Sequence, residues 1–296
     1  MTATVLPAAD PASEPTERCV TCGAALCTPF CPECGEKRAA DRSYSIFHFT
    51  KENVIDAIGS LDGRTFRTLK LLLLRPGELT AQFMRGARLP YLSPLQLFLA
   101  LNLLFFVWSS AERFSILDTP LSVHTTSMPW SQSARAMAHD RMVATKRDSV
   151  AFQAAYDATS HEQAKSLVIL MVPFFAICVA VMAAGRRQSL VKDIVFSMHF
   201  YSFVFIAIPV TLELIIRTNR WILRPLGHPM SNDAGIQLWT ELLAIILAMY
   251  LARALLRAYD MSKLRTVLSG IAGAFVITFV FYLYRYVLLI VGMHSV

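Results

Sequence analysis

Five of the six cysteines fall within sixteen residues, in a pattern that can hold a metal ion. The segments CVTCG at 19–23 and CPECG at 31–35 are Cys-x-x-Cys-Gly knuckles. In each, one tight turn presents two sulfurs, and the glycine accepts the positive φ of that turn. The eight residues between the knuckles are enough for a hairpin that brings the pairs together. The spacing therefore predicts a tetrahedral Zn²⁺ site, with Cys27 outside the ligand set. The predicted ligands are Cys19, Cys22, Cys31 and Cys34.

Two alternatives exist for these cysteines: a pair of disulfides, or a redox Cys-x-x-Cys. A redox pair normally sits on a thioredoxin-like βαβ pattern, which the sequence lacks. Four protein ligands close the coordination sphere of zinc, so the predicted role is structural, and the metal would supply most of the folding energy. A protein is the expected partner of such a ribbon. The mixed charge of the following EKRAADR argues against a nucleic acid.

The overall composition is that of a membrane protein. Hydrophobic residues make up 55% of the chain and charged residues 17%, against about a quarter charged in soluble proteins. The apolar residues are also gathered in long runs. Residues 1–18 contain no apolar h-region and little that can be buried, so we expect a disordered tail and no signal peptide.

The apolar runs predict a mainly α-helical, polytopic membrane bundle of five spans. Four domains follow from this. They are the tail at 1–18, the zinc ribbon at 19–36, basic interfacial helices at 37–92, and the bundle at 93–296. We place the spans at 94–110, 166–184, 194–216, 238–256 and 267–291. The long connection at about 111–165 has helix-forming composition, and we expect it to be helical.

A basic amphipathic region precedes the first span. A short helix ending at Gly59 or Gly63 is followed by helices over 64–74 and 78–86, separated by the helix-stopping Arg75-Pro76-Gly77. Six basic residues and one acid lie between 64 and 88, which is typical of an interfacial helix on an anionic leaflet. The region either anchors the chain by charge alone or recognises specific lipid headgroups. The basic residues are Arg64, Arg67, Lys70, Arg75, Arg85 and Arg88.

The knuckles, together with LDGRTFRTLKLLLLRPGELTAQFMRGARLPYLSPLQLF, resemble the bacterial membrane proteins grouped as domain of unknown function 3667. In that family this stretch carries an acid, a Thr-Leu, an Arg-Pro-Gly, a Gly-x-Arg and a Tyr. Later segments, VFSMHFYSFVF and RALLRAYDMSKLRT, resemble the family less distinctly. The resemblance implies a bacterial inner-membrane protein with a cytosolic zinc ribbon, and no known activity. The matching positions are Asp62, Thr68, Leu69, Arg75, Pro76, Gly77, Gly86, Arg88 and Tyr91.

Charge in the short loops predicts the orientation of the chain. The loops at 185–193 and 253–266 are basic and fall on the same side as the basic N-terminal region if the spans alternate. We therefore expect a cytoplasmic N-terminus and an external C-terminus in a bacterial inner membrane. Zinc-binding thiolates agree with this, because they persist in a reducing cytosol.

Ionisable residues inside spans are costly, so they are usually paired or functional. Glu213, Glu241 and Arg285 are all expected near the external ends of their spans, where Arg285 can pair with either glutamate. The alternatives are a structural ion pair and a polar cavity open to the outside. His199, near the opposite face, is either a hydrogen-bonded packing residue or a proton relay.

Two functions from different classes remain. The first is a non-enzymatic anchor or partner-binding module built on the zinc ribbon, the bilayer and its anionic headgroups. The second is a small transporter or lipid-handling protein that uses an outer-leaflet polar cavity formed by Glu213, Glu241 and Arg285. An enzyme has the least support, because the sequence contains no Gly-x-Ser-x-Gly, His-Glu-x-x-His or P-loop.

Overall fold

The computed structural model describes residues 17–26, 28–38, 63–112, 116–183, 189–228 and 230–296. Most of the expected N-terminal tail, Cys27 and the helix expected before Gly63 lie outside these residues. Within them the chain is mainly α-helical, as predicted, and its β-structure consists of two isolated bridges in the ribbon, Arg18 to Ala25 and Phe30 to Lys37.

Among the described residues, five helices are long and apolar enough to cross a membrane, which confirms the predicted number of spans. The helix that contains the second span begins well before the predicted 166–184, because α7 runs without a break through η3 into α8. The tight 3-10 turn of η3 lies just before Pro173, whose ring removes a backbone donor from the helix. The spans are α4 (Pro94–Ala111), α7–η3–α8 (Ser149–Leu167, Val168–Leu170, Met171–Met182), α9 (Leu190–Thr218) with the π-helical turn η4 (Asn219–Leu223), α10 (Asn232–Tyr259) and α11 (Lys263–Ser295).

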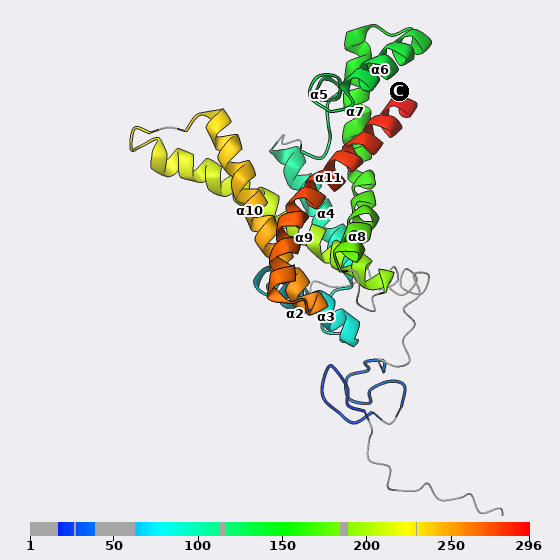
Figure 1. The fold of residues 1–296 in the computed structure, drawn as a ribbon, viewed down its shortest axis with the longest axis vertical. Coiled ribbons are helices and arrows are strands. Elements are labelled where there is room, and N and C mark those ends of the chain that lie inside the picture. Colours follow the sequence, from blue (N-terminus) through cyan, green and yellow to red (C-terminus); the bar gives the residue numbers. More distant parts are fainter. Residues whose placement is uncertain (1–16, 27, 39–62, 113–115, 184–188, 229) are drawn as a thin grey trace, which may run out of the picture.

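Helix α9 is the centre of the bundle. In the most apolar stretch of α9, 61% of the residues are buried inside the protein. In the corresponding stretches of the other four spans the share is 22–44%. Helix α9 packs against α4, α8 and α10 (Figure 1). This explains its composition, because a helix that is apolar around its whole circumference is buried on all sides.

Two short helices lie across one end of the bundle, next to the ribbon (Figure 1). They are α2 (Gly63–Leu74) and α3 (Glu78–Arg85), and we call residues 63–93, which comprise both helices and the segment leading to α4, the collar. Gly77, with a φ of 82°, makes the turn between them. The chain then enters α4 at Pro94, where the Ser93 hydroxyl caps the helix by accepting a hydrogen bond from the Gln96 N–H at 3.2 Å. We refer to this end of the bundle as the ribbon side.

The opposite end, the loop side, carries a small helical unit. Helices α5 (Leu121–Thr126) and α6 (Ser131–Thr145), with the first turns of α7, surround the last turns of α11. The connection expected to be helical at 111–165 thus contains three helices in its described part. Its apolar side chains form a separate core with α11, built from Leu121, Ala134, Ala138, Phe152, Tyr156, Leu289 and Met293.

Candidate metal centre and the collar that holds it

The four predicted ligands meet at one point, and their sulfur atoms all lie within 4.8 Å of one another. Cys19 Sγ is 3.5 Å from Cys34 Sγ, and Cys22 Sγ is 3.5 Å from Cys31 Sγ. A tetrahedral ion with sulfur ligands at 2.3 Å requires sulfur separations of about 3.8 Å. The four cysteines are free thiols, with separations well beyond the ~2.05 Å of a disulfide bond. The donor set therefore fits a metal ion.

The two knuckles have the same geometry, repeated after twelve residues. In each knuckle the glycine N–H donates to the first cysteine carbonyl at 2.9 Å, from Gly23 to Cys19 and from Gly35 to Cys31. Both glycines have a positive φ, 78° and 75°. The outermost bonds of the repeat, Leu26 N–H to Glu17 and Arg38 N–H to Pro29, extend two residues beyond each end of the predicted 19–36. The ribbon therefore spans 17–38 in its described part.

Backbone N–H groups are directed at the Cys31 sulfur and favour its ionised form, whereas burial and the neighbouring sulfurs raise the pKa of Cys34. The Cys34 N–H, and then that of Glu33, donate to the Cys31 sulfur and lower its pKa to about 7 against the opposing effect of burial. A thiolate is the form that binds a metal ion. The fold of the second knuckle thus prepares Cys31 as a ligand.

Glu36, the residue after the second knuckle, joins the ribbon to the collar. Its carboxylate oxygen Oε2 accepts hydrogen bonds from the backbone N–H groups of Arg88 and Leu89, both at 3.1 Å. The same oxygen accepts the Thr21 hydroxyl at 2.8 Å, which links the first knuckle to the second. The side chain is 3% exposed, so these bonds satisfy a buried charge. Glu36 was not among the predicted site residues, and the one local signal for it was an acid directly beside a metal knuckle.

The Arg75-Pro76-Gly77 motif lies against α10. The Tyr250 hydroxyl donates to the Leu72 carbonyl at 2.9 Å, and Arg257 Nη1 donates to the Pro76 carbonyl at 3.1 Å. Between these contacts a Cβ on Gly77 would collide with the Ala254 carbonyl oxygen and lie 2.9 Å from its Cα. The glycine is therefore required by its φ and by the approach of the α10 backbone. The motif fastens the collar to the fourth span.

A second fastening joins the collar to α9. His199 is buried and its Nδ1 is 2.9 Å from the hydroxyl of Thr80, on α3. This geometry agrees with the packing alternative for His199. Thr68 of α2 closes the collar on itself, since its hydroxyl donates to the Arg64 carbonyl at 2.7 Å and accepts the Leu92 N–H at 3.0 Å.

The six basic residues predicted at the membrane surface fall into two groups. Arg64, Arg67, Lys70 and Arg75 are exposed along α2 and its end. Arg85 lies 3.6 Å from Glu78, while the Arg88 guanidinium is stacked 4.3 Å above the Phe83 ring. Three large apolar side chains, Phe66, Leu73 and Leu74, are also exposed on α2, at 72%, 42% and 70%. Helix α2 therefore presents apolar and basic groups together.

A buried carboxylate on the ribbon side was not among the predicted site residues. Asp193, in the first turn of α9, is 1% exposed and accepts the Tyr259 hydroxyl at 2.6 Å. Lys192 lies over the same tyrosine ring, 4.4 Å from its centroid. The pair connects the start of the third span with the end of the fourth. Asp193 and Tyr259 lie at the ends of polar loops, so no pattern in the sequence predicted their contact.

The three ionisable residues expected to meet near the far ends of the spans do not meet. Glu213 pairs with Arg217 at 3.0 Å on its own helix, and Glu241 accepts Gln237 Nε2 at 3.0 Å. Arg285 instead donates to the Ile116 carbonyl at 3.3 Å. Within the described part of the chain no ion pair joins Arg285 to either glutamate. The structure thus holds Arg285 apart from both glutamates, which find partners one helical turn away on their own helices.

These features define a multi-pass helical membrane protein with a four-cysteine metal-binding module fastened to one end. Residues 62–106 match the model of a family described as "Protein of unknown function (DUF3667)", which confirms the predicted resemblance over that stretch. The matched stretch corresponds to the collar and most of α4. No curated protein matches the chain. No solved structure matches it either.

Proposed function

We propose that the protein is a non-enzymatic membrane adaptor, whose zinc ribbon is held on the collar and binds a protein partner there. The observation that carries this proposal is the bonding of Glu36 to the Arg88–Leu89 backbone. A ribbon tied down in this way has a defined position relative to the spans. A partner bound to it would therefore be held in one place at the membrane, which is what an adaptor requires.

Zinc is the metal we assign to the four-cysteine site. Four thiolates in tetrahedral array are typical of Zn²⁺ or an iron–sulfur centre, and the knuckle spacing favours zinc. Cys19, Cys22, Cys31 and Cys34 would hold the ion and leave no open position. Bound zinc would supply folding energy to a ribbon whose own buried core is very small.

The partner surface we propose is on the ribbon. Val20, inside the first knuckle, and Phe30, just before the second, are 47% and 57% exposed. Large exposed apolar side chains on so small a module are typical of contact sites for other proteins. Val20 and Phe30 have these exposures while Glu36 is bonded to the collar, so both remain available to a partner when the ribbon is docked.

We place the ribbon side in the cytoplasm of a bacterium, with α2 on the inner membrane surface. Arg64, Arg67 and Lys70 on α2 would contact anionic headgroups, while Phe66 and Leu74 would enter the headgroup–acyl boundary. Arg257 and Arg265 lie on the same side of the bundle, bonded to the collar and to the end of α8. This agrees with the tendency of cytoplasmic loops to be basic.

The partner surface is tested by chemical cross-linking in intact membranes. We expect the double variant Val20→Ser/Phe30→Ser to keep its zinc and recover roughly tenfold less of the cross-linked protein, a loss of about 1.4 kcal/mol in binding. The matched control is Val143→Ser/Val150→Ser, two exposed valines on the loop side, which should recover the wild-type amount. Equal recovery from all three proteins would exclude the ribbon as the contact surface.

Orientation is tested with reporters fused to the two ends of the chain. A reporter that is active only outside the inner membrane should work after Val296 and fail before Met1. A cytoplasmic reporter should give the opposite result. Activity of the external reporter at the N-terminus would reverse the assignment.

A further inference from the structure

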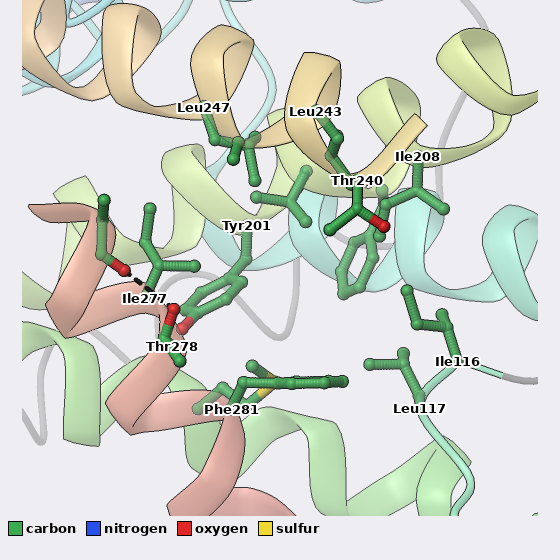
Figure 2. A pocket seen from close by; sticks show the side chains of 15 residues that line it. Ile116, Leu117, Tyr201, Ile208, Thr240, Leu243, Leu247, Ile277, Thr278 and Phe281 are labelled. Carbon is green, nitrogen blue, oxygen red and sulfur yellow. Dashed lines mark hydrogen bonds between the residues drawn. The ribbon is translucent and has the colours of Figure 1, made fainter. Parts of the chain in front are cut away.

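A half-open pocket of about 270 Å³ lies between helices α10 and α11, with α9 forming its floor. The two helices touch at their ribbon-side ends, where a Cβ on Gly270 would lie 3.0 Å from the Ala252 side chain. They separate toward the loop side (Figure 1), and the cavity occupies the space between them. Figure 2 shows Leu243 and Leu247 on one wall, Ile277 and Phe281 on the other, and Ile116 with Leu117 at the loop-side end. We call this space the α10–α11 pocket.

The lining of the pocket is suited to hydrocarbon. Its two threonines are already satisfied within their helices, since Thr240 donates to Ile236 and Thr278 to Ala274. One polar atom has no partner among the described residues, the buried hydroxyl of Tyr201. A polar metabolite would find few groups to bind. By comparison, an apolar cavity of roughly 150 Å³ holds a benzene molecule, so this pocket has room for a longer segment of chain.

The cation Arg285 contacts two residues at the loop-side end of the pocket. The Arg285 guanidinium is 4.3 Å above the ring of Phe281, and its Nη2 donates to the Ile116 carbonyl. Both of those residues line the pocket. Its Nε is buried and has no hydrogen-bond partner among the described residues. Since the glutamates expected beside it are paired elsewhere, Arg285 has unused capacity to bind an anion.

The position of Arg285 along α11 corresponds to a membrane surface. Twenty residues separate it from Arg265 on the ribbon side. This is about 30 Å of helix, the thickness of the hydrocarbon layer. Tyr282 and Tyr286 flank it and pack edge-on against Trp130, with centroids 6.0 Å and 5.3 Å apart. Such aromatic residues gather at the headgroup level of a bilayer.

We propose that the α10–α11 pocket binds a hydrocarbon chain of an anionic phospholipid whose phosphate is held by Arg285. The apolar walls take the chain, and the guanidinium, at headgroup level, takes the phosphate. One lipid can occupy both places, because Arg285 contacts Phe281 and Ile116, which line the pocket. The proposal does not depend on the ribbon or on its partner.

The test measures lipids retained by the purified full-length protein with native mass spectrometry. The probes are phosphatidylglycerol and phosphatidylcholine with identical chains. We expect preferential retention of phosphatidylglycerol, and we expect Arg285→Gln to reduce this preference roughly fivefold, the value of about one charge contact. Ala274→Trp, which fills the pocket, should reduce retention of both lipids. Arg217→Gln, a basic residue outside the pocket, is the matched control and should behave as the wild type.

Folding of each variant is checked by its thermal transition, and Ala244→Leu replaces Ala274→Trp if that variant does not fold. Glycerol phosphate, which has the headgroup chemistry without the chain, should not displace the lipid. Displacement by glycerol phosphate would indicate a simple anion site and overturn the proposal. Wild-type retention by both the Arg285→Gln and pocket-filling variants would overturn it as well.

Discussion

The Glu36 carboxylate and the Leu89 backbone N–H are 3.1 Å apart, although fifty-three residues separate them in the chain. This contact joins the metal-binding ribbon to the turn that leads into the first span. Glu36 directly follows the knuckle of Cys31 and Cys34, so the geometry of the metal site determines where the carboxylate lies. Metal binding and ribbon docking are therefore expected to be coupled.

Replacing Glu36 should release the ribbon from the collar without removing its metal. In Glu36→Ala the N–H groups of Arg88 and Leu89 lose their acceptor, which should cost roughly 2–4 kcal/mol of local stability. Hydrogen exchange at 86–92 should rise, while the zinc content stays at one ion per chain. Glu33→Ala, an exposed acid in the same knuckle, is the control. Unchanged exchange in Glu36→Ala would show that the contact does not hold the ribbon.

Removing the metal should unfold the ribbon and leave the bundle folded. We expect Cys31→Ser to lose bound zinc, measured by elemental analysis, and to become sensitive to protease within 17–38. The reason is that a structural zinc site contributes on the order of 10 kcal/mol or more to the folding of such a module. Cys178→Ser, a thiol in α8 away from the knuckles, should keep both properties. Retention of a full equivalent of zinc by Cys31→Ser would contradict the ligand set.

Gly77 should tolerate no side chain. Gly77→Ala adds a Cβ against the Ala254 backbone at a position with positive φ, and we expect a loss of roughly 3–5 kcal/mol. Gly227→Ala is the matched control, because its φ is 80° and its surroundings are open. Gly227→Ala should lose only the stability that a positive φ costs a residue with a Cβ, about 1–2 kcal/mol. Thermal unfolding of both variants in detergent measures the difference, and equal losses would mean that α10 does not press on the collar.

The loop-side unit should lose stability in acid because of His124. Its Nδ1 accepts the Trp130 indole N–H at 3.2 Å, and an indole is only a donor, so the imidazole must be neutral. Burial, and secondarily the charge of Arg285, lower the pKa of His124 to about 4. An unfolded histidine has a pKa of about 6.5, so acid protonates the unfolded chain first.

The contribution of His124 is therefore complete above pH 6.5 and falls as the pH drops toward 4, by about 3 kcal/mol in total. We expect thermal unfolding of the wild type to show this loss between pH 7 and pH 4, and His124→Phe to lack most of it. His139→Phe removes an exposed histidine and should keep the wild-type pH dependence. If His124→Phe loses as much stability in acid as the wild type, His124 is not the responsible group.

Much of the architecture was accessible from the chain alone. The spans follow from runs of apolar residues, and the metal ligands follow from covalent spacing, so each is encoded within a short window. Span ends were less accessible. Helix α7 continues from the loop-side unit into the second span, because a polar helix and an apolar one can share a continuous backbone.

The contacts of Arg285 could not be predicted from the sequence for a related reason. Depth along a helix was estimated correctly enough to place Arg285 and the glutamates near the same end of the bundle. Depth does not specify the direction in which each side chain points around its helix. Glu213 forms an ion pair with Arg217 on its own helix. Arg285 donates a hydrogen bond to the carbonyl of Ile116, which lines the α10–α11 pocket.

The knuckles and the basic amphipathic stretch before the first span were thus determined by the sequence itself, since each is a local pattern of residue types. What only the tertiary structure decided is how these parts are joined. Glu36 meets Leu89, and Arg257 meets the Pro76 carbonyl across 181 residues. Such contacts depend on the packing of whole helices, and no short segment of the chain contains both partners.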